Sequence, residues 1–171
     1  RIVCIGGITK SGGAAVKLRL REGARVAVAD IDADAGRRFT EGLGERARFF
    51  AVDVRDEEQV AGLMEQAVGW LGGLDGLCQN AGLLRVGATE TFSASDWDAV
   101  YAVNVRAQFL GVKHAVAHLR RSGGGSIVNM SSLAGRRGGA GRAAYSSAKA
   151  AVIGMGNSLA AELAPDGIRV N

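Results

Sequence analysis

The chain has little of several features that would each point to a particular class of protein. Aromatic residues make up only 5% of its 171 residues, so few rings are available to stack on nucleic-acid bases. No apolar run approaches the length of a membrane-spanning helix. The net charge is +4, but the basic residues are dispersed, with only short pairs such as Arg120–Arg121 and Arg136–Arg137. We therefore expect no nucleic-acid partner and no membrane partner.

Cysteine and histidine are equally scarce. Cys4 and Cys78 both lie in apolar runs, which predicts buried free thiols and fits a reducing cytoplasm, so we expect a cytoplasmic protein. His114 and His118 share one face of a predicted helix, as a solvated or subunit-interface pair. There is no third histidine and no nearby acidic ligand, so we expect no metal site.

Apolar segments typical of strands and helices alternate along the chain. The expected strands cover residues 1–5, 25–30, 47–54, 74–80, 124–132 and 167–171, and the expected helices cover residues 12–21, 33–43, 56–72, 95–119 and 142–164. Strands that alternate with helices predict a parallel sheet with right-handed crossovers and helices on both faces. We therefore expect one Rossmann-type domain over residues 1–171, a doubly wound α/β fold in three layers.

Ligands of such sheets bind beyond the carboxyl ends of the strands. The first strand is followed by the glycine-rich stretch "GGITKSGG" (6–13), whose backbone N–H groups can meet a pyrophosphate at a helix N-terminus. Asp30 ends the second strand, eighteen residues beyond Gly12, close to the spacing of an acid that binds the adenosine ribose. Asp53 ends the third strand, and the small residues of "QNAG" (79–82) end the fourth. This pattern favours a dinucleotide site.

One helical stretch, "AAYSSAKAAV" (143–152), places Tyr145 four residues before Lys149. Side chains at this spacing lie on the same helix face. By itself the pair also fits a surface position, with the phenol covering the edge of a core and the ammonium in water.

The motifs together resemble a classical short-chain dehydrogenase/reductase, over essentially all 171 residues. They occur in the family's order: the glycine loop, Asp30, Asp53–Val54, "NAG" at 80–82, "NV" at 104–105, "NMSS" at 129–132, and Tyr145 with Lys149. The resemblance implies that Asn104, Ser132, Tyr145 and Lys149 are catalytic. It implies that the cofactor is bound by Gly6, Lys10, Ser11, Gly12, Asp30, Ile31, Asp53, Val54, Asn80, Ala81 and Gly82, and also by Tyr145 and Lys149.

Those residue types suit the interconversion of a secondary alcohol and a ketone. A free phenol titrates near about pH 10 and is a poor base at neutral pH, whereas a nearby ammonium and the positive ring of oxidised nicotinamide favour the phenolate. Ser132 can donate to the substrate oxygen. The resemblance implies that Lys149 holds the nicotinamide ribose and that Asn104 connects the lysine to solvent through water.

Three positions depart from the family pattern. Ile5 stands where the family has threonine, and Gln79 where it often has asparagine. Lys10 falls where a second loop glycine would be when the loop is aligned backwards from Gly23, whereas an alignment with a one-residue gap uses Gly12–Gly13 instead. The family also continues past the sixth strand with a Pro-Gly segment, substrate-covering helices and a last strand, which we expect to be absent from these 171 residues.

The sequence therefore predicts an NAD(H)-dependent oxidoreductase acting on a small-molecule alcohol or ketone. One alternative is an NADPH-dependent reductase of 3-oxoacyl thioesters; Lys10 would favour a 2′-phosphate and Asp30 would oppose it. Another is a nucleotide-sensing protein without catalysis. The resemblance, with the small residues Ala150, Ala151, Gly154 and Ser158 on one helix face, predicts a homotetramer that pairs through the helices at 95–119 and 142–164.

Overall fold

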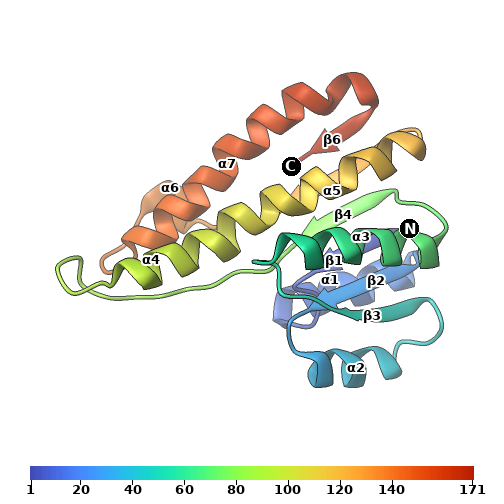
Figure 1. The fold of residues 1–171 in the computed structure, drawn as a ribbon, viewed down its shortest axis with the longest axis horizontal. Helices are drawn as coiled ribbons and strands as arrows, with labels where there is room; N and C mark the ends of the chain where they lie inside the picture. The colour runs from blue at the N-terminus through green and yellow to red at the C-terminus, as the bar shows by residue number, and fades with distance from the viewer.

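A computed structural model describes all residues, 1–171, and is built around one six-stranded parallel sheet (Figure 1). The strand order is β3-β2-β1-β4-β5-β6. Strands β2 and β3 are added on one side of β1 and strands β4 to β6 on the other, so the switch point in strand order lies between β1 and β4. The strands are β1 (Ile2–Ile5), β2 (Val26–Asp30), β3 (Ala47–Ala51), β4 (Gly76–Gln79), β5 (Gly125–Asn129) and β6 (Ile168–Val170). The predicted doubly wound Rossmann-type fold is confirmed.

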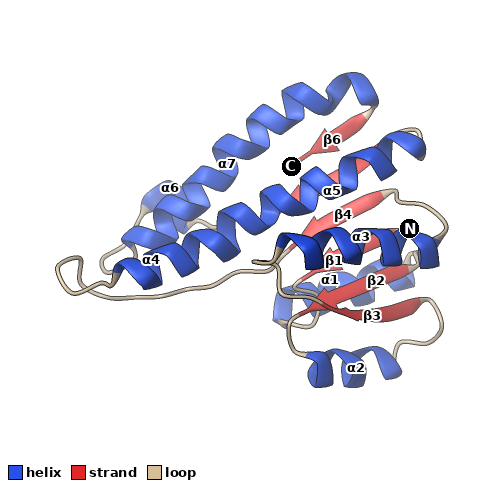
Figure 2. Ribbon diagram, viewed as in Figure 1, coloured by secondary structure: helices blue, strands red, loops and turns tan.

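Helices cover both faces of the sheet (Figure 2). They are α1 (Lys10–Arg21), α2 (Ala33–Glu41), α3 (Glu57–Leu71), α4 (Ala94–Tyr101), α5 (Ala107–Arg121), α6 (Ala134–Arg137) and α7 (Ala143–Leu163), with a π-helical turn at Ala102–Arg106 and a 3-10 turn at Ala164–Asp166. None of the helices combines the length and apolar character needed to cross a lipid bilayer.

The two faces of the sheet bury different side chains because residues alternate between faces along each strand. Val3 and Ile5 of β1 belong to the larger core, beneath α3, α5 and the end of α7, together with the fully buried Met64 and Leu110. On the other face, Cys4 packs with residues of α1 and with Cys78, its register partner in β4. Both cysteines are buried and free, as predicted.

The carboxyl ends of the strands meet at one edge, where the connections are long. Residues 80–93 run from β4 out to α4, beside the start of α7 (Figure 1). The Val52 N–H donates to the Asp30 carbonyl oxygen, and β2 ends at Asp30. Residues 53 and 54 therefore have no neighbouring strand to pair with. The predicted third strand therefore stops at Ala51, and Asp53 lies in the loop above the sheet.

The predicted helix at 95–119 is interrupted. Asn104 lies in the π-helical turn, and its side-chain Nδ2 donates to the carbonyl oxygens of Val100 (2.8 Å) and Leu83 (2.7 Å). Its Oδ1 accepts from the Leu83 N–H at 3.3 Å, so the side chain ties the turn to the loop after β4. Such π turns occur often at functional sites.

The histidine pair on α5 is placed differently from the prediction of a solvated or interface pair. His118 is 5% exposed, and its Nε2 lies 3.2 Å from a carboxylate oxygen of Glu65 on α3. Its Nδ1 accepts from Arg121, because a guanidinium can only donate. His114 lies 3.4 Å from a different glutamate, Glu57. The sequence missed both carboxylates because they come from a helix that is distant in the chain.

Candidate active site

A cavity of about 620 Å³ opens at the carboxyl edge of the sheet, between the cofactor-type loops and the start of α7. Its lining joins elements that are far apart in the sequence. The predicted residues that line it are Gly6, Ser11, Asp30, Ile31, Asp53, Val54, Asn80, Ala81, Gly82, Tyr145 and Lys149. The predicted Lys10, Gly12, Asn104 and Ser132 lie outside this lining, each for a reason that the local structure shows.

The loop after β1 approaches the loop after β4 closely enough to exclude side chains. Gly6 has φ +73°, and a Cβ there would lie 2.4 Å from the backbone nitrogen of Ala81. A Cβ on Gly12 would lie 2.0 Å from the Gly6 carbonyl oxygen. The turn is thus closed by Gly6 and Gly12, which favours the alignment that uses Gly12–Gly13, while Lys10 is the exposed first residue of α1.

The same turn leaves its backbone donors available to a ligand. The N-cap of α1 is Thr9, whose hydroxyl donates to Gly6 (3.2 Å) and makes no cap to the helix. Asn80 holds the turn from the side, with Nδ2 donating to the Gly6 carbonyl and to the Thr9 hydroxyl, each at 3.1 Å. The N-terminus of α1 has no side-chain cap, and the glycine turn before it has no room for a Cβ at Gly6 or Gly12. This arrangement fits the binding of a dinucleotide pyrophosphate.

Two carboxylates lie farther along the cavity. Asp30 accepts from the N–H groups of Ile31 (2.9 Å) and Ile8 (3.5 Å), which fixes it at the end of β2. Asp53 is engaged by Arg55, whose Nε and Nη2 donate to both of its oxygens. This bonding lowers the pKa of Asp53 below its usual value.

Tyr145 and Lys149 lie together at the inner end of the cavity. The Lys149 side chain is 2% exposed, its Nζ donates to the Met130 carbonyl oxygen at 2.7 Å, and it lies 5.8 Å from the centroid of the Tyr145 ring. Burial lowers the pKa of the Lys149 ammonium to about 8. A lysine in such surroundings is no solvated surface group, so the surface alternative for this pair is wrong.

The other two predicted catalytic residues, Asn104 and Ser132, lie outside the cavity lining. Asn104 is fully buried, and a Cβ on Gly82 would lie 3.1 Å from its Oδ1 and 3.7 Å from Lys149 Nζ. The Ser132 hydroxyl accepts from the Ala134 N–H at 3.2 Å, at the start of α6. The structure therefore brings both Asn104 and Lys149 close to Gly82, and it places Ser132 in the segment between β5 and α6.

Several residues that shape the site were missed from the sequence. Thr9, Arg55, Leu83, Leu84, Arg85, Val103, Met130 and Ser131 also line the cavity. Ser131 donates to the carbonyl oxygen of Lys149 at 2.7 Å and so anchors α7 to the end of β5. The "NMSS" motif contains Ser131 next to Ser132, but its position gave no sign of which serine faces the helix backbone.

Gln79 was noted as a departure, and the structure gives it a supporting place. Its buried amide donates to the Gln108 carbonyl oxygen and to Asn129 Oδ1, each at 2.8 Å. These bonds join β4, α5 and β5 beneath the cavity. The substitution therefore affects the framework of the site and leaves its lining unchanged.

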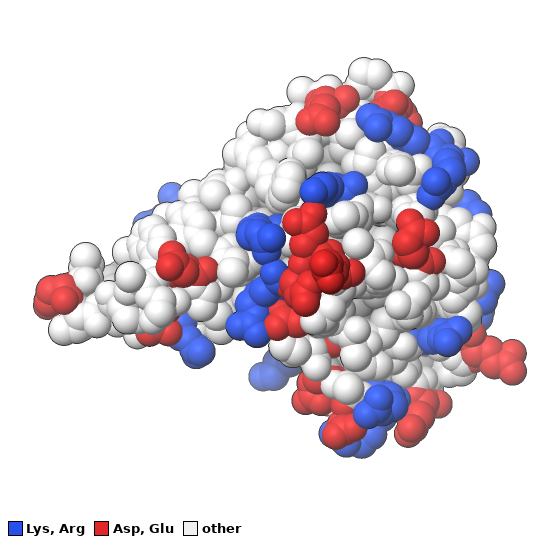
Figure 3. All heavy atoms as spheres, viewed as in Figure 1, with Lys and Arg blue, Asp and Glu red and all other residues white.

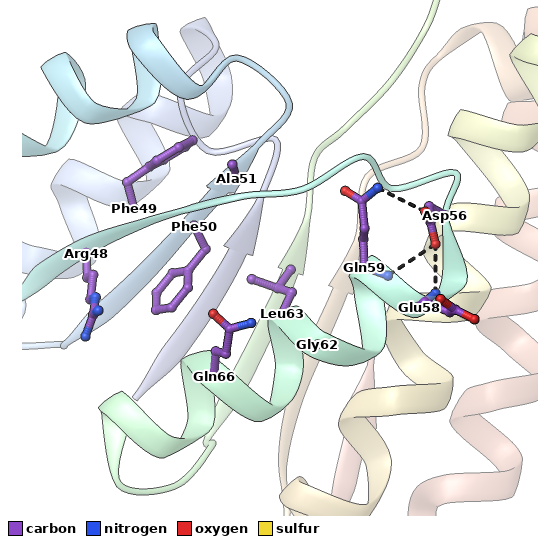
Figure 4. A pocket seen from close by; sticks show the side chains of 10 residues that line it. All are labelled: Arg48, Phe49, Phe50, Ala51, Asp56, Glu58, Gln59, Gly62, Leu63 and Gln66. Carbon is purple, nitrogen blue, oxygen red and sulfur yellow. Dashed lines mark hydrogen bonds between the residues drawn. The ribbon is translucent and has the colours of Figure 1, made fainter.

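A second hollow, of about 510 Å³, lies at the outer edge of the sheet between β3 and α3 (Figure 4). Phe50 and Leu63 line it together with polar side chains from the first turns of α3, where Asp56 caps the helix and accepts from Gln59 (Figure 4). It contains none of the predicted site residues, so the candidate active site is the cavity at the carboxyl edge.

Comparison with known proteins places the chain in a family. The family described as short chain dehydrogenase matches residues 1–171. A 3-alpha-(or 20-beta)-hydroxysteroid dehydrogenase of Mycobacterium tuberculosis is 36% identical over 97% of this chain and 64% of its own length. A probable galactose dehydrogenase of Rhizobium meliloti is 38% identical over 99% of this chain and 68% of its own length.

A solved structure agrees with these relatives. The crystal structure of sorbitol-6-phosphate 2-dehydrogenase from Erwinia amylovora superposes with a TM-score of 0.95 and 30% identity, covering 99% of this chain and 69% of that one. The chain spans 64% of the length of the mycobacterial relative that it matches. By its sequence and its fold, the chain belongs to the short-chain dehydrogenase family.

Proposed function

We propose that this protein is an NAD(H)-dependent oxidoreductase that interconverts a secondary alcohol and a ketone. The observation that carries the proposal is the buried Lys149 ammonium beside the Tyr145 ring, at the inner end of a cavity large enough for a dinucleotide. A buried cation next to a phenol is costly to maintain and favours the phenolate, so it fits a proton-transfer role better than a packing role.

Each residue has a separate task in this mechanism. Tyr145 removes the hydroxyl proton of an alcohol, or returns it to the oxygen formed from a ketone. Ser132 donates to the substrate oxygen, and Lys149 stabilises the phenolate while its Nζ is held by the Met130 carbonyl. Bound nicotinamide supplies the hydride acceptor or donor.

Asn104 is a positioning residue in this scheme. Its amide bonds to Val100 and Leu83 fix the π-helical turn, and the close contact with Gly82 holds the loop next to Lys149. Asn104 therefore holds the loop at Gly82 and Leu83 in a fixed position next to Lys149.

The cavity supports NAD over NADP. Asp30 lies in its wall, where a carboxylate can accept from both ribose hydroxyls, whereas Lys10 does not line it. Arg55, a basic residue of the cavity wall, is already bonded to Asp53. The reductase of 3-oxoacyl thioesters that uses NADPH is therefore the second candidate, and NADPH preference would identify it.

The helices beside the site also support a homotetramer. Phe109 is 48% exposed and Trp97 is 39% exposed on α5 and α4, and an apolar hollow of about 520 Å³ lies between Tyr101, Phe109 and Met155. A Cβ on Gly154 of α7 would meet nothing within 4 Å, so a second helix can approach its backbone. Light scattering should show a tetramer at micromolar concentration, and a stable monomer would contradict this assembly.

The test of the function is turnover. The full chain is incubated with NAD and a panel of secondary alcohols, and with NADH and the matching ketones, while the absorbance of reduced nicotinamide is followed. Ser132→Ala should lower turnover, because it removes the hydroxyl that donates to the substrate oxygen. Ser147→Ala is the matched control, because it removes a hydroxyl that bonds only to the carbonyl oxygens of Ala143 and Ala144 within α7. Binding of NADH without turnover of any substrate by the wild type would favour the nucleotide-sensing alternative.

A further inference from the structure

The acidic residues of the chain are concentrated in its first part. Between Asp98 and Glu162 there is no acidic residue at all, although this stretch contains α5, β5, α6 and most of α7. The carboxylates Asp30 and Asp53 of the cavity belong to the first part. The basic residues of this stretch therefore have no carboxylate of the same stretch to balance them.

Some basic residues of this stretch have ionic partners on other elements. Lys113 lies 2.6 Å and Arg106 lies 3.6 Å from Glu57 of α3, and Arg120 lies 2.7 Å from Asp166. Acidic and basic side chains accordingly lie side by side over α3 and α5 (Figure 3). These residues need no ligand to balance their charge.

Three arginines on the loop between Ser132 and Tyr145 are different. Arg136, Arg137 and Arg142 are exposed and take part in no ion pair. Arg21 and Arg46, which are also unpaired, have carboxylates beside them in the sequence, at Glu22 and Glu45, and the unpaired Arg121 is bonded to His118. The loop arginines have none.

The loop is held in place at several points. A Cβ on Gly135 would lie 2.7 Å from the carbonyl carbon of Lys149, so α6 rests on the backbone of α7. The Gly141 carbonyl oxygen accepts from the Gly87 N–H at 3.0 Å. Arg142 is the N-cap of α7, about 4.5 Å along the helix axis from Tyr145 at the usual rise per residue. The charges are thus carried on an anchored loop beside the proposed catalytic tyrosine.

We infer that the substrate carries an anionic group, a phosphate or a carboxylate, at a short distance from the carbon that reacts. Guanidinium groups match both anions through paired N–H donors. Exposed cations gathered beside a site also attract ligands of the opposite sign. Arg85 lies in the cavity wall, 3.5 Å from the half-exposed Asp96. This inference rests on the proposed oxidoreductase function and adds the substrate class to it.

The test compares ketones that differ only in the remote anion, with NADH as the reductant. Suitable pairs are fructose 6-phosphate with fructose, for a phosphate, and acetoacetate with its methyl ester, for a carboxylate. We expect kcat/KM to favour the anionic member of at least one pair by about tenfold or more at low salt, and the preference to shrink as ionic strength rises. Equal kcat/KM within every pair would overturn the inference.

Variants of the three loop arginines test whether they cause the preference for the anionic ketone. Replacing Arg136, Arg137 and Arg142 together by alanine should lower kcat/KM for the anionic member at least about tenfold more than for the neutral one, mainly through KM. Replacing all three by lysine keeps the charge and should retain most of the preference. The control is the triple alanine variant of Arg21, Arg38 and Arg46, which removes the same charge from exposed positions near the other edge of the sheet. An unchanged preference in the first variant would contradict the inference.

Failure of the two proposals can be told apart. If no ketone or alcohol is turned over, the oxidoreductase proposal fails, and the anion site is then tested by calorimetric titration of each pair. Tighter binding of the anionic member, lost in the Arg136/Arg137/Arg142 alanine variant, supports the site. Equal affinity for both members of every pair overturns it.

Discussion

The cofactor half, residues 1–82, and the catalytic half, residues 83–171, build one cavity by different means. In the cofactor half the essential feature is a missing side chain, because a Cβ at Gly6 or Gly12 would collide with backbone atoms. In the catalytic half it is a buried polar side chain, as for Asn104 and Lys149. Substitutions should therefore damage shape in the first half and chemistry in the second.

The largest effect is expected from Lys149→Met, which keeps the length of the side chain and removes its charge. Turnover should fall by roughly 10²- to 10⁴-fold, because the phenolate loses its stabilising cation. The fold should survive, since the charge that is removed is buried. Steady-state kinetics and a circular dichroism melt test both statements; a variant with near wild-type turnover would show that the chemistry does not depend on this residue.

In the cofactor half we expect Gly6→Ala to act on shape. The new Cβ would lie 2.4 Å from the Ala81 nitrogen, and the residue would keep φ +73°. Gly44→Ala is the matched control, with φ +76° and nothing within 4 Å. The control should cost about 1 kcal/mol of unfolding free energy through backbone strain alone.

Gly6→Ala should cost at least about 1 kcal/mol more than this control, because backbone atoms must also move. It should weaken NADH binding by about tenfold or more. Chemical denaturation and fluorescence titration measure the two effects. Equal losses in both variants would mean that the close approach of the two loops is unimportant.

The preference for NAD or NADP tests Asp30, a side chain of the cofactor half. We expect kcat/KM for NAD to exceed that for NADP by at least about tenfold, a difference of roughly 1.4 kcal/mol, because a 2′-phosphate would face the Asp30 carboxylate. Asp30→Ala should shrink the ratio, and Lys10→Ala should widen it. A preference for NADP in the wild type would show that basic residues, and not Asp30, determine which cofactor binds.

A further effect concerns pH. Burial lowers the pKa of Lys149 to about 8 in the folded protein, against about 10.4 in an unfolded chain. Folding therefore releases a proton from this group between those values, so its contribution makes the protein more stable as pH rises from about 8 to about 10.4 and constant outside that window. The wild type should gain stability relative to Lys149→Met across this pH window, as measured by denaturant midpoints. If the midpoints of the two proteins changed with pH in the same way, the lowered pKa of Lys149 would be contradicted.

Sequence patterns predicted most of the framework. Four of the six strands are nearly where the periodicity put them, because apolar runs between glycine-rich turns are typical of buried parallel strands. The third and fifth strands were each drawn three residues too long, because β3 ends at its pairing with Asp30, the last residue of β2, and β5 ends at its pairing with Gln79, the last residue of β4. The short helix α6 was missed because four residues between glycines carry no periodic signal.

The site was predictable where chemistry is local and was not where it depends on distant contacts. Tyr145 with Lys149 could be named from their spacing. The π-helical turn could not, because it depends on bonds from Asn104 to the loop at Leu83, far away in the chain. Likewise Arg55 lies beside Asp53 in sequence, but only the structure shows that its guanidinium is bonded to that carboxylate.

The central claim is that Tyr145 transfers the proton while the cofactor half binds independently of it. The most direct test measures kcat and the NADH dissociation constant on the same preparation of full-length Tyr145→Phe. The account predicts a kcat about 10²- to 10⁴-fold lower, with a dissociation constant within about twofold of the wild type, because only one hydroxyl is removed. A variant that keeps more than about a tenth of the wild-type kcat would contradict it.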